Sequence, residues 1–136
     1  VIQSDALEYL KHQSDSSWGV VTAFHLIEHL PFEVLLVFLA HIRRIVKPGG
    51  LLIIETPDPK NVHVGTHDFL LDPTHTRALP PPLVEFLLEE NGWKDLHIMG
   101  LHPRVEAASE RADSLLDELS ALFWGYQDYA ILATKE

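Results

Sequence analysis

The sequence predicts an α/β fold built on a mostly parallel β-sheet, and three observations lead to this prediction. Residues 18–56 follow the pattern strand, helix, strand with short links, which is typical of a right-handed βαβ unit. A second helix-then-strand pattern follows over residues 82–101. An apolar segment at 129–134 predicts a last strand, which could form an antiparallel end of the sheet.

The first strand is expected at residues 18–24, a short β-rich segment that is apolar on both faces, as in a strand buried within a parallel sheet. Pro31 is a common first residue of a helix. The helix that follows carries an apolar stripe at Leu35, Phe38, Leu39, Ile42, Ile45 and Val46. Residues 47–50, with two glycines and a proline, stop this helix, and 51–56 reads as a second buried strand.

The second half of the chain begins with a long aperiodic segment. Residues 58–82 are rich in proline and histidine and predict a loop, a length at which loops are usually functional or disordered. A short helix is expected at 82–91 and a strand at 96–101. Residues 105–123 form the best amphipathic helix pattern. Its apolar stripe is interpreted as packing on its own sheet, with a partner-binding face as the alternative.

Length and composition limit the classes of protein. The 136 residues suit one domain, 1–136, with one hydrophobic core. Ten Lys and Arg against twenty Asp and Glu give a net charge of −10, which argues against nucleic acid and anionic membrane surfaces as partners. The lack of cysteine excludes disulfides and thiolate chemistry and is compatible with the cytoplasm, the compartment we expect. We interpret the chain, which opens on Val1 in mid-pattern, as part of something longer.

Several segments carry a resemblance to a known family. They occur in this order: Asp5-Ala-Leu, Trp18-Gly-Val-Val, His25-Leu-Ile-Glu-His-Leu30 and Ile45-Val-Lys-Pro-Gly-Gly-Leu-Leu52. The chain resembles the C-terminal half of a class I S-adenosylmethionine-dependent methyltransferase, over roughly residues 1–101 and more weakly 126–134. Residues 55–59 and 72–75 are similar to methyltransferases that accompany glycosyltransferases in polysaccharide synthesis.

The resemblance implies a sheet of order 3-2-1-4-5-7-6 with an antiparallel seventh strand. The chain would hold the end of strand 3 and strands 4 to 7, with residues 105–123 as a helical insert. The glycine-rich cofactor loop would be missing, and the sequence indeed contains no Gly-x-Gly. Without strand 1, residues 18–24 would form an open apolar edge. Such edges pair with other chains, so we expect a homo-oligomer through this strand.

The resemblance also implies S-adenosylmethionine as the cofactor. Asp5 would accept a hydrogen bond from the adenine amino group, and Ala6 would offer its backbone N–H. Phe24 and His25 would line the pocket of the sulfonium, in a cleft wall that includes Thr56. Two simpler interpretations stay open: Asp5 caps the helix that starts at Ala6, and His25 is a polar turn residue.

His25 is the first candidate for a catalytic base. It follows the carboxyl end of a strand, where ligands of open α/β sheets bind, and neutral histidine can take a proton from a substrate hydroxyl. His75 is the second candidate base, and His29 completes the candidate catalytic set. The expected reaction is methyl transfer to a hydroxyl of a small molecule or glycan, with this chain alone inactive. A non-catalytic interaction module is the alternative.

Residues 25–29 also spell H-x-x-E-H, a zinc hydrolase motif that needs both histidines on one helix face. The expected helix begins only at Pro31, so we expect no metal, and no zinc shared by His25 and His29. The long segment holds further groups with the chemistry of metal ligands: His63, His67, Asp68, Asp72 and His75. They are interpreted as a lid held by internal hydrogen bonds.

Overall fold

The computed structural model describes residues 1–104 and 115–136. Its four strands are β1 (Trp18–Phe24), β2 (Val46–Pro57), β3 (Trp93–Pro103) and β4 (Tyr126–Lys135). They form one sheet of order β1-β2-β4-β3, in which β1 and β2 are parallel and β4 is antiparallel to both of its neighbours. The predicted α/β class is confirmed, but the mostly parallel sheet with an antiparallel end is not: the sheet is mixed, and its antiparallel strand β4 lies between β2 and β3. The order also agrees with 4-5-7-6, which the resemblance implies for these strands.

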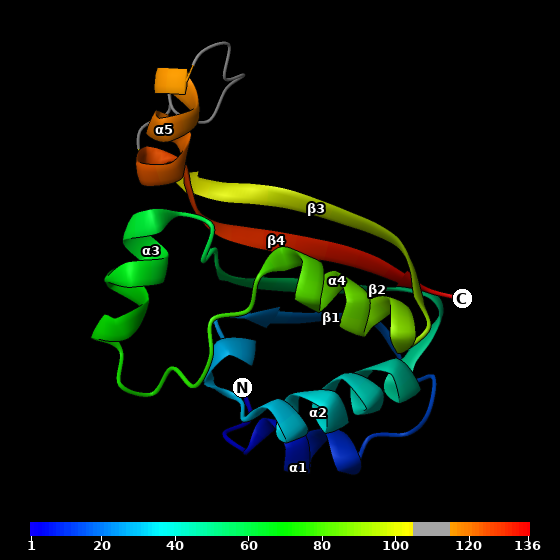
Figure 1. The fold of residues 1–136 in the computed structure, drawn as a ribbon. Coiled ribbons are helices and arrows are strands. Elements are labelled where there is room, and N and C mark those ends of the chain that lie inside the picture. The colour runs from blue at the N-terminus through cyan, green and yellow to red at the C-terminus, as the bar shows by residue number, and fades with distance from the viewer. Residues whose placement is uncertain (105–114) are drawn as a thin grey trace.

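The helices gather beside one face and one end of the sheet (Figure 1). They are α1 (Ala6–Lys11), α2 (Phe32–Ile45), α3 (Val62–Thr66), α4 (Pro81–Glu90) and α5 (Leu115–Trp124), with 3₁₀ turns η1 (Ile27–His29) and η2 (Asp68–Leu71). Buried side chains of α1, α2 and α4 share one core with the strands. Among the described helices, none is long and apolar enough to cross a membrane.

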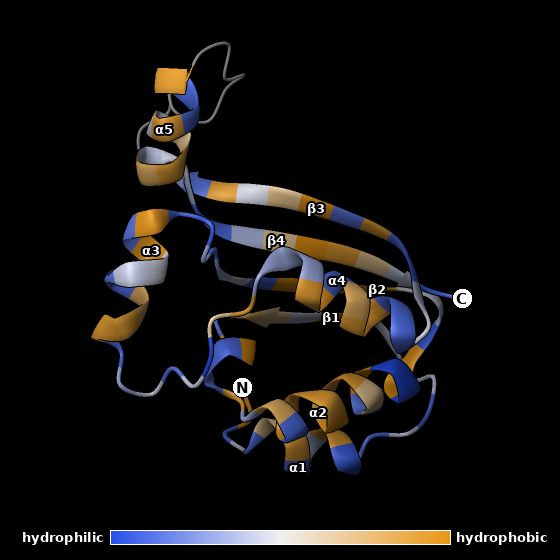
Figure 2. Ribbon diagram, viewed as in Figure 1, coloured by the Kyte–Doolittle hydropathy of each residue, from blue (hydrophilic) through white to orange (hydrophobic). Residues whose placement is uncertain are grey.

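The sequence pattern of α2 explains its packing. The predicted stripe is buried at Leu35, Phe38, Leu39, Ile42 and Ile45, whereas Val46, also expected on this stripe, is the buried first residue of β2. Pro31 precedes the first helical residue as the N-cap, which suits its fixed φ. Apolar residues also run along β3 and β4 (Figure 2). In β4, Tyr129 is buried in the core and donates a hydrogen bond from its hydroxyl to the Leu79 carbonyl at 2.7 Å.

Strand β1 is an edge strand, as expected, but the prediction that it is buried on both faces is wrong. Ala23 is buried against the helices, whereas Val20 is 51% exposed and Phe24 is 55% exposed. Val20 and Phe24 alternate with Ala23 along the strand, so their side chains point to the other face of the sheet. An apolar run by itself cannot distinguish a central strand from an edge strand, because the difference lies in which neighbours the strand finds.

Two expectations at the ends of the fold need correction. The end of a third strand was expected at the N-terminus, but residues 1–4 form no strand. The helical insert was expected at 105–123. Its described part is α5, while residues 105–114 lie outside the described residues.

The apolar stripe of α5 does not pack on the sheet. None of its residues is buried, and Leu115 and Leu116 are 70% and 77% exposed. Figure 1 shows the reason, since α5 projects beyond the ends of β3 and β4.

The segment 58–82, expected to be a loop, contains α3 and η2. Asn61 starts α3 as its N-cap, because its side-chain oxygen accepts the N–H groups of His63 and Val64 at 3.0 and 3.3 Å. A helix of five residues is too short to show a period, so sequence patterning does not reveal it.

Candidate functional site

Polar side chains from all four strands meet at one edge of the sheet. His25 follows β1 with a left-handed φ of 46° and donates its backbone N–H to the Glu55 carbonyl of β2 at 2.9 Å. This φ is uncommon for a non-glycine residue and turns the chain sharply away from the strand. His102 lies near the end of β3, which runs parallel to β2, and Asp128 lies near the start of the antiparallel β4. The predicted location of the site, at the carboxyl ends of the parallel strands, therefore gathers titratable groups.

Glu28 lies at the centre of this edge. It belongs to η1 and its side chain is fully buried. Its Oε2 accepts a hydrogen bond from Thr56 Oγ1 at 2.8 Å, and its Oε1 lies 3.3 Å from His25 Nδ1. Thr56 was expected to line an open cleft with Phe24 and His25. The structure corrects this, because Thr56 is fully buried and holds Glu28 instead.

A first group of ionisable side chains, called the outer group here, lies next to Glu28 and consists of His25, Glu55, His102 and Asp128. Glu55 Oε1 is 3.4 Å from His25 Nε2 and 3.2 Å from His102 Nε2. Burial raises the pKa of the nearby Asp128 carboxyl, an effect that His25 and His102 partly oppose. Ligand atoms of His25, Glu55 and Asp128 lie within 4.8 Å of one another, close enough to hold a metal ion after small rotations.

A second group, called the inner group here, consists of His29 and His75 and also lies next to Glu28. The rings of His29 and His75 have centroids 4.7 Å apart, and His75 also stacks on Phe69 at 4.3 Å. Thr76 brings His75 to this position, because its N–H donates to the Glu28 carbonyl at 2.8 Å. The three histidines predicted as catalytic candidates thus all lie around Glu28, with His75 joining His25 and His29 from a distant part of the sequence.

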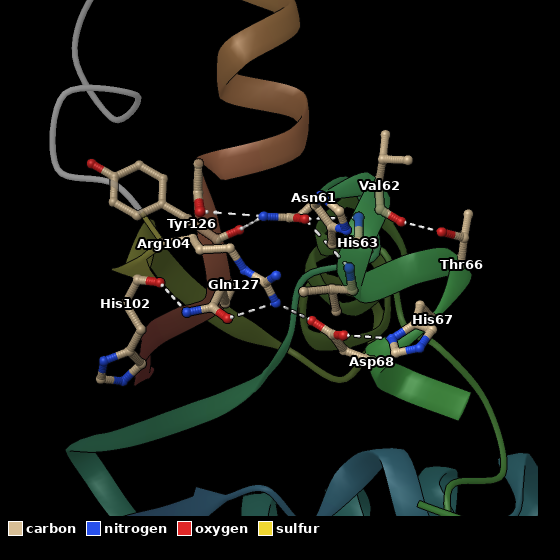
Figure 3. Close-up of polar contacts among 12 residues, drawn as sticks. Asn61, Val62, His63, Thr66, His67, Asp68, His102, Arg104, Tyr126 and Gln127 are labelled. Atoms are coloured by element: carbon tan, nitrogen blue, oxygen red, sulfur yellow. Dashed lines mark hydrogen bonds and ion pairs between the residues drawn. The ribbon is translucent and has the colours of Figure 1, made fainter. Parts of the chain in front are cut away.

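A hydrogen-bond network fixes the long segment to the far ends of β3 and β4 (Figure 3). The Asn61 amide donates to the carbonyls of Gly125 and Tyr126 at 3.2 and 3.1 Å. Arg104 forms an ion pair with Asp68 of η2. A hydrogen bond from His67, together with the charge of Arg104, lowers the pKa of the Asp68 carboxyl. The segment that carries His75 is therefore held at both ends.

A small pocket of about 170 Å³ opens between the long segment and this edge. It is lined by Pro57, Val64, Asp68, Phe69, His75, Gln127 and Asp128. Sites for drug-sized ligands usually measure about 300–1,000 Å³. The pocket therefore suits one polar group of a substrate rather than a whole nucleoside.

Asp5 and Ala6, the residues expected near the adenine, have structural roles in this chain. Asp5 Oδ1 accepts the Glu8 N–H at 2.9 Å, so Asp5 caps α1, as the simpler interpretation has it. Ala6 packs against the core. Phe24, the expected sulfonium neighbour, is exposed at the end of β1.

The H-x-x-E-H motif does not form the α-helix that a zinc hydrolase needs. His25 is in a turn and His29 in the 3₁₀ turn η1, and they belong to the two different groups described above. The other histidines of the long segment do not join them. His67 pairs with Asp68, and His63 packs edge-on against Phe123 at 5.7 Å.

Sequence reasoning did not select Glu28, Glu55, His102 and Asp128 as site residues. Glu55 had a usable signal, because it is a charged residue directly after the apolar run 51–54 of the predicted strand. Glu28 had only its place in the H-x-x-E-H motif, which suggested zinc ligation by a helix. The positions of His102 and Asp128 depend on the register of β3 and β4, which spacing alone does not give.

Comparisons with known proteins agree on one family. A family model described as a methyltransferase domain matches residues 3–98. A probable S-adenosylmethionine-dependent methyltransferase of Mycolicibacterium smegmatis is 33% identical over 87 residues, which cover 64% of this chain and 33% of that protein. This chain therefore spans about a third of the length of that relative.

Crystal structures agree in the fold. A SAM-dependent methyltransferase from Archaeoglobus fulgidus is similar with a TM-score of 0.86 at 30% identity, covering 98% of this chain and 66% of that chain. Phosphoethanolamine N-methyltransferase 2 of Haemonchus contortus, in complex with S-adenosyl-L-methionine, has a TM-score of 0.65 at 15% identity, covering 96% of this chain and 36% of that one. At 15% identity the second likeness concerns the fold alone.

Proposed function

Since this chain belongs to the family of S-adenosylmethionine-dependent methyltransferase domains, we propose that it forms the acceptor side of a methyl-transfer site with His25 as the base. The observation that carries the proposal is the position of His25 at the carboxyl end of β1, between the carboxylates of Glu28 and Glu55. The bound cofactor supplies an electrophilic methyl group on a sulfonium. The chain's own residues orient the acceptor and remove its proton.

The proposed reaction is a direct displacement. The acceptor hydroxyl oxygen forms a bond to the methyl carbon while the carbon–sulfur bond breaks, and the hydroxyl proton goes to an imidazole nitrogen of His25. Glu28 and Glu55 stand 3.3 and 3.4 Å from the two ring nitrogens. Both carboxylates are placed to accept a hydrogen bond from a ring N–H of His25 after the proton transfer.

The acceptor we propose is a hydroxyl of a sugar or another small molecule. The likeness of residues 55–59 and 72–75 to enzymes of polysaccharide synthesis supports a glycan. The net charge of −10 also favours a neutral acceptor over an anionic polymer. A sugar hydroxyl is the size of group that the pocket beside His75 and Asp128 admits. We place this chemistry in the cytoplasm.

The cofactor contacts we propose are Asp5 and Ala6 toward adenine and Phe24 and His25 toward the sulfonium. Asp5 has a second carboxylate oxygen besides the one that caps α1. A glycine-rich loop usually cradles the rest of such a cofactor, and this sequence contains no Gly-x-Gly. We therefore expect this chain to bind S-adenosylmethionine weakly and to be inactive alone.

The test measures formation of S-adenosylhomocysteine from S-adenosylmethionine and a panel of sugar acceptors, by the full-length protein that contains this chain. The His25→Gln variant should lower kcat by about 10²-fold or more, since a positioned base contributes about 10²–10⁴-fold. The matched control is His97→Gln, which replaces an exposed histidine of β3. Unchanged turnover in His25→Gln would exclude His25 as the base.

A further inference from the structure

We infer that Glu28, His29 and His75 form a binding site for a divalent first-row transition-metal ion. One ligand atom of each residue lies within 4.8 Å of the others, and the three come from η1 and from the segment folded over it. The inference does not depend on methyl transfer. It rests on three features of the described residues: an unpartnered carboxylate oxygen, and two imidazole rings whose free nitrogens are fixed by their hydrogen bonds.

The first feature is the Oε1 atom of Glu28. It is buried and makes no hydrogen bond among the described residues, and His25 Nδ1, which lies 3.3 Å away, does not form one with it. The other oxygen, Oε2, accepts a hydrogen bond from Thr56. If the carboxylate turned to bring Oε1 to another donor, this bond from Thr56 would be lost. A buried carboxylate oxygen without a partner is costly, and buried charges in proteins are usually paired or bound to metals.

The second feature is the protonation of His75. Its Nδ1 lies 2.7 Å from the Phe69 carbonyl oxygen, which can only accept a hydrogen bond. Nδ1 therefore carries the proton, and Nε2 of the neutral ring keeps a free lone pair. Stacking on Phe69 also holds the ring in place. An imidazole that donates one N–H to a backbone carbonyl and offers the other nitrogen is the usual arrangement of a metal-binding histidine.

The third feature is the protonation of His29. Its Nδ1 lies 2.9 Å from Thr74 Oγ1. The single hydroxyl proton of Thr74 is donated to Asp72 Oδ1 at 2.6 Å, so this oxygen accepts from His29. The proton of His29 is thus on Nδ1, and its Nε2 also keeps a lone pair. Two separate hydrogen-bond systems leave the same nitrogen free on two neighbouring rings.

The ligand set indicates the class of ion. Two imidazoles with one carboxylate suit zinc, iron, cobalt or nickel, whereas magnesium prefers oxygen ligands. Ligands of a tetrahedral ion lie about 3.4 Å apart for bonds of about 2.0–2.1 Å. The three groups must therefore approach one another slightly, which rotations of the two partly exposed rings allow.

The other candidate group, around His25, lacks these features. In that group Glu55 Oε1 is already hydrogen-bonded to His102 Nε2 at 3.2 Å. No oxygen of Glu55 or Asp128 is both buried and unpartnered in the described structure. For this reason the inner group, and not the outer one, is the site.

The test uses the chain without an affinity tag and freed of metals by a chelator. Titration with CoCl₂, followed by visible absorption, and with ZnCl₂, followed by calorimetry, should each show one equivalent bound. MgCl₂ in large excess should not compete. The His29→Ala and His75→Ala variants should each weaken binding at least tenfold. Loss of only the hydrogen bond that orients a metal-binding histidine already costs roughly 10–100-fold in affinity, and loss of the histidine itself should cost more. The matched control His97→Ala should bind as the wild type does.

A measurement on the wild type removes any doubt about folding of the variants. In imidazole ¹⁵N spectra, Zn²⁺ should shift the Nε2 resonances of His29 and His75 and leave those of His97 and His12 in place. Absence of binding at millimolar Zn²⁺, or ring shifts confined to His25 and His102, would overturn the inference.

Discussion

Thr56 and Glu28 are joined by a hydrogen bond of 2.8 Å from Oγ1 to Oε2, with both side chains removed from solvent. This bond links the end of β2 to the turn η1 and positions the carboxylate around which the three candidate histidines lie.

Replacement of Thr56 by valine should destabilise the fold. The variant keeps the shape of the side chain but leaves Glu28 Oε2 buried without a donor, which should lower the free energy of unfolding by about 1–3 kcal/mol in urea denaturation. The control is Thr134→Val, whose hydroxyl bonds to Lys94 and Asp95 are exposed and should matter less. Equal effects of the two substitutions would contradict a special role of the buried bond.

Asn61 should be essential for the position of the long segment. It is 3% exposed, donates to two carbonyls beside α5 and caps α3. The Asn61→Asp variant keeps the acceptor for the cap but has no N–H to donate. Hydrogen exchange of the amides in α3 should therefore become faster in this variant, while exchange in α2 stays unchanged. Equal exchange in both helices would show that the segment is held by other contacts.

The stability of the protein should depend on pH through two aspartates, Asp128 and Asp68, whose pKa values are shifted in opposite directions. Burial raises the pKa of the Asp128 carboxyl, so the folded state binds its proton more tightly than the unfolded state does. The stability that the protonated Asp128 contributes is lost as the pH rises from about 4, the ordinary pKa of an aspartate, through the raised pKa of the folded state. The Asp128→Asn variant should therefore be more stable than the wild type at pH 7, and this gain should vanish below about pH 4.

Asp68 should behave in the opposite way. Its pKa is lowered by the hydrogen bond from His67 and by Arg104, so its stabilising contribution is present at neutral pH. That contribution is lost as pH falls below about 4 through the folded pKa. Urea denaturation of Asp68→Asn between pH 3 and 7 should show a loss of stability at pH 7 that shrinks with acid. The same pH dependence in both variants would contradict these assignments.

The open edge of β1 leads to a prediction about association. Among the residues that the structure describes, the strand pairs with β2 along one side only; it contains neither proline nor charge, and it exposes Val20 and Phe24. We propose that two copies of this chain pair through this edge. Light scattering at about 50 μM should show at least twice the mass of one chain, a concentration at which even micromolar association is populated.

A charge at this edge should break the pairing. Val20→Lys should give a monomer, whereas Val37→Lys, at an exposed position of α2, should not. A wild-type chain that is monomeric at this concentration would refute the proposal.

Regular elements were predictable where local chemistry determines them. The apolar stripe of α2 and the presence of a strand after it depend on spacing, proline and glycine, all visible in the sequence, but residues 47–50, expected as a stop before the strand, belong to β2 itself. The edge position of β1 followed from the resemblance, whereas its exposure did not follow from its composition. The helix α3 depends on the capping and anchoring of one residue, Asn61, which no periodicity shows.

The site was predictable in place but not in composition. The carboxyl end of β1 follows from the general rule for open α/β sheets, whereas the choice of His25 as the base stays a prediction. The role of Glu28 depends on a bond to Thr56, 28 residues later in the sequence. The approach of His75 depends on Thr76 bonding to the backbone of η1. Such contacts between distant segments are set by tertiary packing, so a single sequence does not contain a local signal for them.

The central claim is that this chain carries one side of a methyltransferase cofactor site, at the carboxyl end of β1. The most direct test is a titration of the ¹⁵N-labelled chain with S-adenosylhomocysteine, followed by amide chemical shifts. The account predicts weak binding, in the millimolar range, with the largest shifts at Asp5, Ala6, Phe24 and His25. Micromolar binding, or shifts confined to residues away from these four, would contradict it.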